Sequence, residues 1–324
     1  HEHNTITTVR LALEAREVLK QMAREEGIDF DCEDRGILHF YKNQADFDAG
    51  TRASELLAKG GLQRRAVTPQ EIESIEPSLK GPIYAGIYTE SDFSGDIHKF
   101  TVGLAKACVR LGADLQLATL VSAVKADADR ITITSRSVEP THDQQDHDYH
   151  YENDNHDDEV RTFDQVVVCS GVMSRDLAKG LGDRLNVYPV KGYSITVDLI
   201  EQSDQAMAPW TSLLDDQAKI VASRLGANRF RVAGTAEFNG YNTNIETARI
   251  EPLIAWCRRH FPSMSTRQCV PWAGLRPMMP DMMPRVMHGN NPRVFYNTGH
   301  GHLGWTLSAA TADLVCGLIM QSSI

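Results

Sequence analysis

The spacing of apolar and polar residues divides this chain of 324 residues into segments of helical and of strand character. Apolar residues recur at helical spacing in 5–26, 44–59, 70–79 and 97–111. Short apolar or alternating runs predict strands at 36–41, 81–88, 114–119, 121–127 and 130–137. The segments at 96–136 combine a helix with strands, which is typical of an α/β layer.

In the second half of the chain the pattern of apolar and polar residues predicts mostly strands. The run VVV at 166–168 predicts a strand buried on both faces, and a glycine turn and a helix follow it. Alternating segments at 185–200 and 219–238 predict antiparallel strands, and the second holds a hairpin turn at 227–229. A helix is predicted around 246–261. We therefore expect two interleaved domains, an α/β layer of nucleotide-binding type and a sheet-rich cap.

A glycine loop lies close to the C-terminus. A short apolar strand at 294–296 leads into Gly299-His300-Gly301-His302-Leu303-Gly304, and a helix follows. The loop fits the pattern G-x-G-x-x-G, but a dinucleotide-binding fingerprint also needs a second strand and an acidic residue about 20 positions later. Without these, the loop is predicted to present bare backbone N–H groups to the oxygen atoms of a ligand.

Composition and charge indicate which classes of partner the protein is expected to bind. The net charge is −10, so no basic face for a nucleic acid is expected. No apolar run is expected to span a bilayer and the N-terminus has no signal-peptide pattern, which favours a cytoplasmic location. The tract 139–159 holds six Asp, three Glu and four His. It is predicted to be an exposed insertion, with a metal-binding loop as the alternative, and no metal site is predicted elsewhere.

Four segments carry a family resemblance. They are VYPVKGYSITV at 187–197, the segment 213–243, WAGLRPMMPDMMPRV at 272–286 and NTGHGHLGWT at 297–306. In this order they resemble the flavin-dependent D-amino-acid oxidase superfamily, and within it the small subunits of bacterial D-amino acid dehydrogenases. The resemblance covers essentially the whole chain outside 137–160.

The resemblance implies a mixed α/β flavoprotein with an FAD-binding layer and an antiparallel-sheet substrate cap. The domains are then 1–95 (a helix and part of the cap), 96–184 (part of the FAD-binding domain, with 137–160 as the insertion), 185–271 (the cap) and 272–324 (the C-terminal part of the FAD-binding domain). Members of the family begin with a nucleotide-binding unit, so roughly a hundred residues are expected to precede this segment. A fragment, a unit supplied by a partner chain, and an inactive product remain alternatives.

Residues of a substrate site follow from the same resemblance. Arg276, in Gly-Leu-Arg-Pro, matches the arginine that grips the substrate carboxylate, for which a planar guanidinium is well suited. Tyr193 could donate its hydroxyl to the same carboxylate or close the pocket, and Tyr241 is a weaker candidate of this kind. A tyrosine packed inside the cap is the alternative for Tyr193, and an ion-paired strand residue is the alternative for Arg276.

The resemblance also implies the FAD-binding residues. Gly299, His300, Gly301, His302, Leu303 and Gly304 would line the flavin, and Val121, Val124, Ser170 and Gly171 would contact the nucleotide part. His302 departs from the smaller residue, commonly Thr, that we expect at its position. His300 matches the family pattern and is predicted to be structural rather than a catalytic base. Simple packing of a strand on a helix is the alternative for Val121, Val124, Ser170 and Gly171.

The implied activity is oxidation of a D-amino acid by hydride transfer from Cα to flavin N5, which gives a 2-oxo acid and ammonia after hydrolysis. The resemblance implies a quinone or another respiratory acceptor, and hence peripheral attachment to the inner face of the cell membrane as an alternative location. Two other hypotheses stay open. The chain could be a non-catalytic subunit of a hetero-oligomer, or the scaffold could take proline, hydroxyproline or sarcosine.

Overall fold

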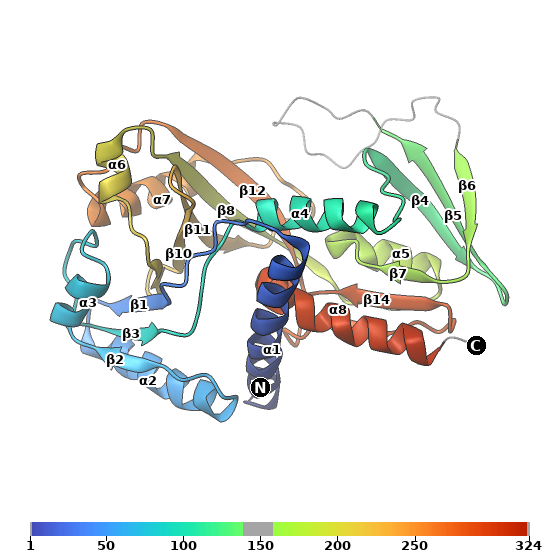
Figure 1. Cartoon of the computed structure of the whole chain (residues 1–324), viewed down its shortest axis with the longest axis horizontal. Helices are drawn as coiled ribbons and strands as arrows, with labels where there is room; N and C mark the ends of the chain where they lie inside the picture. Colours follow the sequence, from blue (N-terminus) through green and yellow to red (C-terminus); the bar gives the residue numbers. More distant parts are fainter. Residues whose placement is uncertain (1, 139–157, 323–324) are drawn as a thin grey trace.

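The computed structural model describes residues 2–138 and 158–322, so most of the acidic, histidine-rich tract lies outside the described residues. The helices are α1 (Glu2–Glu26), α2 (Gln44–Lys59), α3 (Pro69–Ile75), α4 (Ile97–Arg110), α5 (Ser174–Gly180), α6 (Gln202–Met207), α7 (Thr247–His260) and α8 (Gly304–Gln321), with short 3-10 turns η1 (Gly171–Met173) and η2 (Gly301–Leu303). Figure 1 shows helices and strands interleaved along the chain, in a mixed α/β arrangement.

The largest sheet in the described part of the chain has eight strands in the order β12-β8-β11-β10-β9-β1-β3-β2. These strands are β1 (Ile37–Tyr41), β2 (Arg65–Val67), β3 (Ala85–Thr89), β8 (Tyr188–Asp198), β9 (Ser212–Asp215), β10 (Ile220–Leu225), β11 (Arg229–Glu237) and β12 (Cys269–Met278). Neighbouring strands are antiparallel except β1 and β9, which pair in parallel. The sheet therefore joins the first quarter of the chain to its C-terminal half.

One face of this sheet is covered by α7 and holds the main core. Alternate residues of β8 and β11, such as Ile195 and Phe230, point to this face and pack with Trp256 of α7. All three side chains are buried. The opposite face of the same strands carries small and polar residues, because side chains alternate along a strand. That second face is the one on which a ligand could lie.

Two smaller sheets make up the other half of the molecule (Figure 1). One has the order β13-β14-β7, and its strands are β13 (Arg285–His288), β14 (Val294–Thr298) and β7 (Val166–Val168). The other is the antiparallel β4-β5-β6, with β4 (Thr119–Ala126), β5 (Ile131–Ser137) and β6 (Glu159–Phe163). Buried Val124, Ile131, Val168 and Val294 join both sheets in one core cluster. Within the first sheet β7 and β14 run in parallel.

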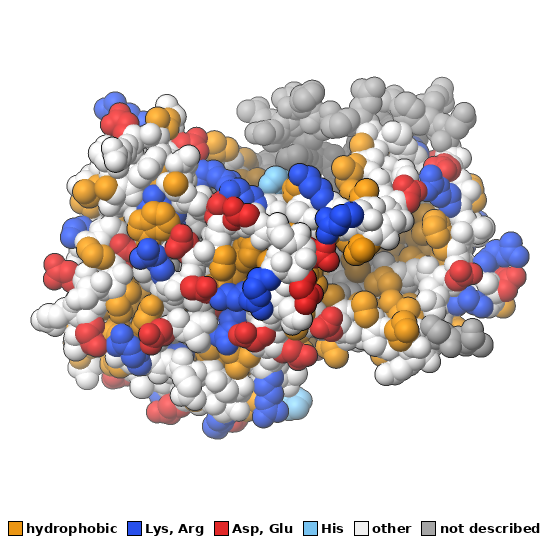
Figure 2. Space-filling model, in the orientation of Figure 1, with side chains coloured by type: hydrophobic (Ala, Val, Ile, Leu, Met, Phe, Trp, Pro, Cys, Tyr) orange, Lys and Arg blue, Asp and Glu red, His pale blue; other side chains and the backbone are white. Residues whose placement is uncertain are grey.

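The N-terminal and C-terminal helices pack together. Ala15 and Leu19 of α1 meet Ala309 and Ala310 of α8, and small side chains let the two helices approach closely. By length and composition alone, Gly301–Gln321 could cross a membrane, so the expectation that no apolar run is long enough was wrong. Figure 2 shows apolar side chains gathered along the outer side of α8, where Leu314 is exposed.

The structure corrects several sequence-based expectations. Residues 114–118 form no strand, so the strand predicted at 114–119 is absent. The strand predicted at 121–127 is present as β4 and begins earlier, at Thr119. The strand β6 was not predicted, because polar residues dominate it. The strand β7 was predicted to be buried on both faces, but only its Val168 is buried. In the described part of the chain β7 lies at the edge of its sheet, which leaves its other residues partly exposed. The boundary predicted at 271/272 falls inside β12, which pairs with β8 along its whole length, so the cap sheet extends to Met278.

Candidate active site

Two glycine turns lie side by side at the carboxyl ends of the parallel strands β7 and β14. The first holds Gly171 and leads into α5, and the second holds Gly299 and Gly301 and leads into α8. All three glycines have positive φ, at 56°, 78° and 59°, which other residues adopt only with strain. Ligands of open α/β sheets bind at the carboxyl ends of parallel strands, so these turns form a candidate cofactor site.

The helices that begin at these turns have free N-terminal N–H groups. Asn43, Thr68 and Asp96 cap α2, α3 and α4 with side-chain oxygen atoms. No side chain caps the start of α5 or of α8, nor the 3-10 turn that precedes each of them. The helices α6 and α7 also lack such caps, so the feature counts here only together with the glycines of positive φ. Uncapped N–H groups and the helix dipole favour an electron-rich ligand. A Cβ atom at position 171 would meet nothing within 4 Å, so the backbone there is open to such a ligand.

Hydroxyl groups connect the two turns. Oγ of Ser174 lies 2.8 Å from Oγ1 of Thr298, and Oγ of Ser170 lies 3.2 Å from that of Ser174. The Thr298 hydroxyl also lies 3.3 Å from the carbonyl oxygen of Gly171. Ser174 and Thr298 are buried. This chain of contacts fixes the spacing of the predicted residues Ser170 and Gly171 relative to Gly299.

Val121 and Val124 lie on β4, whose pairing with β5 is irregular between Val121 and Ala123. Val124 is buried in the core cluster that includes Val168 of β7, while Val121 is 38% exposed. The structure therefore places Val124 next to the strand that leads into the first turn. Whether the backbone of either residue contacts a nucleotide stays a prediction.

The two histidines of the C-terminal loop have different surroundings. Nε2 of His300 lies 2.9 Å from Oγ1 of Thr311, a contact that ties the loop to α8. His302 lies beside Arg276, in the lining of one cavity. Burial lowers the pKa of both imidazoles, and the positive charge of Arg276 lowers that of His302 further. His302 is therefore neutral in the folded protein at neutral pH.

Two glycines opposite each other make the floor of this cavity of about 220 Å³. Gly192 of β8 pairs with Gly274 of β12. A Cβ atom at position 192 would lie 2.2 Å from Cζ of Arg276, and one at position 274 would lie 2.1 Å from Cη2 of Trp272. The guanidinium group and the indole ring thus lie flat over neighbouring strands, in space that any larger residue would fill. This close approach explains why glycine stands at both positions.

Arg276 enters the cavity with little to hold it. Its Nη1 donates one hydrogen bond, 2.9 Å long, to the carbonyl oxygen of Thr235 on β11. Burial lowers the pKa of Arg276, and the nearby positive charge of Arg231 lowers it further. The group stays charged, because an arginine is not deprotonated in a protein. Most of its N–H donors therefore remain available to an anion.

Arg231 is a second guanidinium in the same cavity, and the sequence analysis missed it. It lies on β11, with Cζ 5.2 Å from the centre of the Trp272 ring. Burial also lowers the pKa of Arg231. Within residues 2–138 and 158–322, neither Arg231 nor Arg276 forms an ion pair with a carboxylate. Two unpaired cations in one cavity are costly unless an anion occupies it.

Tyr193 has its hydroxyl occupied by a partner within the protein. Its ring is 1% exposed and belongs to the core on the α7 side of the sheet. Its hydroxyl donates a 2.8 Å hydrogen bond to Glu237, which also lies 3.4 Å from Nζ of the buried Lys191. Tyr193 still belongs to the lining of the cavity, but its ring packs in the core and its hydroxyl is bonded to Glu237, an arrangement that favours the alternative of a tyrosine packed inside the cap. Tyr241 lies outside the residues that line the cavity and close to the charges of Arg175 and Asp176.

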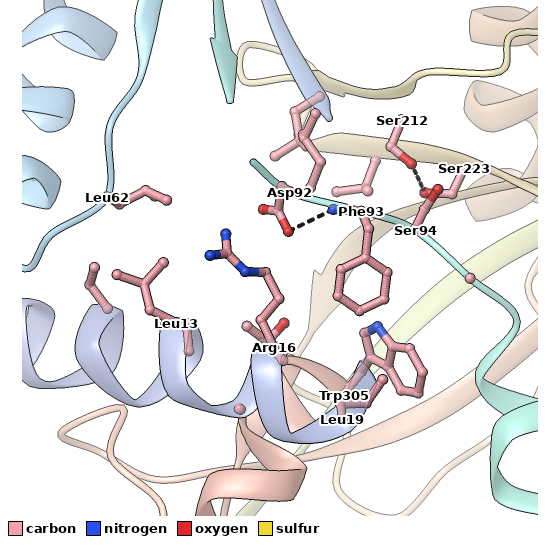
Figure 3. Close-up of a pocket in the computed structure, with 18 residues that line it drawn as sticks. Leu13, Arg16, Leu19, Leu62, Asp92, Phe93, Ser94, Ser212, Ser223 and Trp305 are labelled. Carbon is pink, nitrogen blue, oxygen red and sulfur yellow. Dashed lines mark hydrogen bonds between the residues drawn. The ribbon is translucent and has the colours of Figure 1, made fainter. Parts of the chain in front are cut away.

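A larger and more apolar cavity of about 320 Å³ lies between α1 and the same face of the sheet (Figure 3). Arg16 points into it, but this guanidinium has partners in Glu17 and in the carbonyl oxygen of Ser91, each at 2.9 Å. The wall facing α1 includes Ser212 and Ser223, whose hydroxyls are 2.8 Å apart. Ser223 is the cross-strand neighbour of Arg231, so the two cavities adjoin on one face.

Comparison with known proteins agrees with this arrangement. Residues 2–318 match the family model of the DAO FAD-dependent oxidoreductases. The chain belongs to this family. FAD is therefore the cofactor. Together with relatives that are named D-amino acid dehydrogenases, the family match identifies the protein as an FAD-dependent amino-acid oxidoreductase.

Among these relatives is D-amino acid dehydrogenase 3 of Mesorhizobium japonicum, with 50% identity over 319 residues that cover 98% of this chain and 73% of the relative. The D-amino acid dehydrogenase of Paramagnetospirillum magneticum is 38% identical over 98% of this chain and 71% of its own length. Glycine oxidase from Geobacillus kaustophilus is similar in fold, with a TM-score of 0.80 at 21% identity over 97% of this chain and 79% of the oxidase. The resemblance stated from the motifs is confirmed, and so is the fold class.

Proposed function

We propose that this DAO-family protein oxidises D-amino acids to 2-oxo acids and ammonia and passes the electrons to a quinone. Arg276 is the observation that carries the proposal. A partly buried guanidinium with a single hydrogen bond, over a floor of glycine, is suited to bind a carboxylate through two parallel N–H···O bonds. Two such bonds fix both the position and the orientation of an amino acid.

The residues around Arg276 define what else the site does. Gly301 and His302 line the cavity, so the glycine loop lies within reach of a substrate held by Arg276. Neutral His302 adds no positive charge that would compete for the carboxylate. A bound substrate would also displace water from the partly buried guanidinium, and the bond to its carboxylate strengthens in these drier surroundings.

The residues present fit FAD. The glycine turns at positions 171, 299 and 301 have positive φ, and the helices that follow them lack side-chain caps. These N–H groups would hold electron-rich oxygen atoms of the cofactor. When bound, FAD supplies the acceptor for the hydride from Cα of the amino acid. The chain itself positions the carboxylate and shields the site from water.

A quinone acceptor and peripheral membrane attachment form the outer part of this proposal. They rest on the relatives named as dehydrogenases, and on the apolar outer side of α8. Flotation of the protein with phospholipid vesicles tests the attachment. A protein that stays at the bottom of the gradient would contradict it.

The decisive experiment is an absorption spectrum of the chain after addition of FAD and removal of the free cofactor. We expect a retained flavin band that D-alanine bleaches without oxygen and L-alanine leaves unchanged. Bleaching by L-alanine or by L-proline alone would contradict the proposed substrate class. A colourless protein would show that the flavin is held only together with a further polypeptide segment. In the flavin-loaded protein, Arg276→Met should lower the bleaching rate at low D-alanine far more than at saturation.

A further inference from the structure

Two arginines on the same strand and the same face have opposite surroundings. Arg229 and Arg231 are two residues apart on β11, so both point away from the α7 side of the sheet. Arg229 forms an ion pair with the carboxylate of Asp96, which also caps α4. Arg231 packs against the ring of Trp272 and points into the cavity that holds Arg276. The negative charge of Asp96 acts on Arg231 as well, but only from beyond ion-pair distance. The fold thus gives Arg229 an ion pair with Asp96, whereas the same carboxylate acts on Arg231 only at longer range.

The ring of Trp272 connects the two guanidinium groups of the cavity. It lies over Gly274, which pairs with the glycine under Arg276, and it stacks near Arg231. Trp272 is 52% exposed, although a large aromatic side chain is usually buried. The indole therefore packs against the guanidinium of Arg231 on one side of the cavity, while Arg276 lies over the glycine floor. A ligand that enters would meet both cations.

We propose that Arg231 binds a second anionic group, so that the site prefers D-amino acids with an acidic side chain. This preference rests on the function proposed above, because Arg276 must hold the α-carboxylate for Arg231 to bind the carboxylate of the side chain. A carboxylate would neutralise Arg231 as Asp96 neutralises Arg229. An uncharged side chain would leave that cation unpaired in a partly buried place, which is unfavourable.

The matched ligands for a test are glutarate and its monoamide, glutaramate. They have nearly the same shape and differ by one negative charge. Binding is measured by calorimetry and by the fluorescence of the exposed Trp272, with Trp272→Phe to assign the signal. We expect the protein to bind glutarate at least about ten-fold more tightly than glutaramate, which corresponds to one charge-assisted contact. The preference should weaken at high salt, because the contact lies near the surface.

Four variants separate the roles. Arg231→Met should bring the two affinities within about two-fold of each other while glutaramate binds as before, and Arg231→Lys should keep part of the preference. Arg229→Met is the control, because it removes a cation of the same strand that is already paired, and it should leave the ratio unchanged. Arg276→Met should weaken both ligands.

Each result decides between the two proposals. Equal affinities in the unaltered protein, or a preference that survives Arg231→Met, would overturn the role of Arg231 and leave Arg276 in place. Failure of both ligands to bind would overturn the carboxylate site itself. Tighter binding of hexanoate than of glutarate would assign specificity to the apolar cavity beside α1 instead of to Arg231.

Discussion

Two arginines, Arg224 that is buried and Arg276 that is partly buried, show how differently the same side chain can be used. Arg224 is 1% exposed, its Cζ lies 3.8 Å from the ring centre of Trp210, and its donors reach four backbone carbonyl oxygens. The acceptors are those of Gln205, Ala208, Gly226 and Ala227, at 2.7–3.1 Å. Arg276 has one such bond. A guanidinium with four of its five donors bonded to the backbone holds the fold together, whereas one with most donors unused is available to a ligand.

The largest effect on stability is expected from Arg224→Met. The substitution leaves several buried carbonyl oxygens without a donor, and we expect the free energy of unfolding to fall by about 3 kcal/mol. Urea unfolding followed by circular dichroism measures it. The matched variant Arg276→Met removes one bond and a charge repelled by Arg231, so its stability should change by less than about 1 kcal/mol. Equal losses in both variants would contradict the distinction between the two arginines.

Gly192→Ala should separate binding from folding. The added methyl group would occupy the position of the Arg276 guanidinium, which must move off its floor. We expect glutaramate to bind about 30-fold more weakly, which is roughly 2 kcal/mol. Gly317→Ala is the control, because a Cβ atom there meets nothing within 4 Å and lies within α8. Unchanged binding in Gly192→Ala would mean that the position of Arg276 over glycine does not matter.

Thr298→Val tests whether the hydroxyl chain holds the two glycine turns together. Valine keeps the shape of threonine but loses the contacts with Ser174 and with the carbonyl of Gly171. We expect a loss of about 1 kcal/mol in stability and a matching loss in FAD retention. Thr51→Val, on the exposed side of α2, should change neither quantity. Full FAD retention in Thr298→Val would show that the turns keep their spacing without this hydroxyl.

The smallest effect concerns pH. The pKa of His302 in the folded protein lies below its ordinary value of 6.5. The unfolded chain therefore binds more protons than the folded one below about pH 6.5, and the free energy of unfolding falls as the pH falls. His302→Gln should reduce this decline between about pH 7 and 5 and leave stability near pH 8 unchanged. Parallel urea titrations of both proteins give the comparison, and identical slopes would contradict it.

The sequence motifs predicted the architecture, which is confirmed, and named Arg276 and Tyr193, whose roles stay predictions, but no motif pointed to Arg231 or to the side of the sheet on which the ring of Tyr193 packs. The motif around Arg276 resembles a family motif, so the residue could be named without knowledge of the fold. The direction of a strand side chain depends instead on which face is buried, and pairing on both sides of β8 decides this. The signal was present: 193, 195 and 197 are Tyr, Ile and Val, while 192, 194 and 196 are Gly, Ser and Thr. The same alternation on β11 turns Arg231 toward the cavity.

The parallel pairing of β1 with β9 also sets the order in which the protein can form. Ile37 pairs with Ser212, so 175 residues (212 − 37) separate the partners in the chain. Such a contact forms late, because a long loop must close first. While the chain is being synthesised, β1 can pair with β3 on one edge. Its other edge stays unpaired until β9 has been synthesised. Until then, that edge of β1 is exposed to wrong pairing in the nascent protein, the situation in which chaperones act.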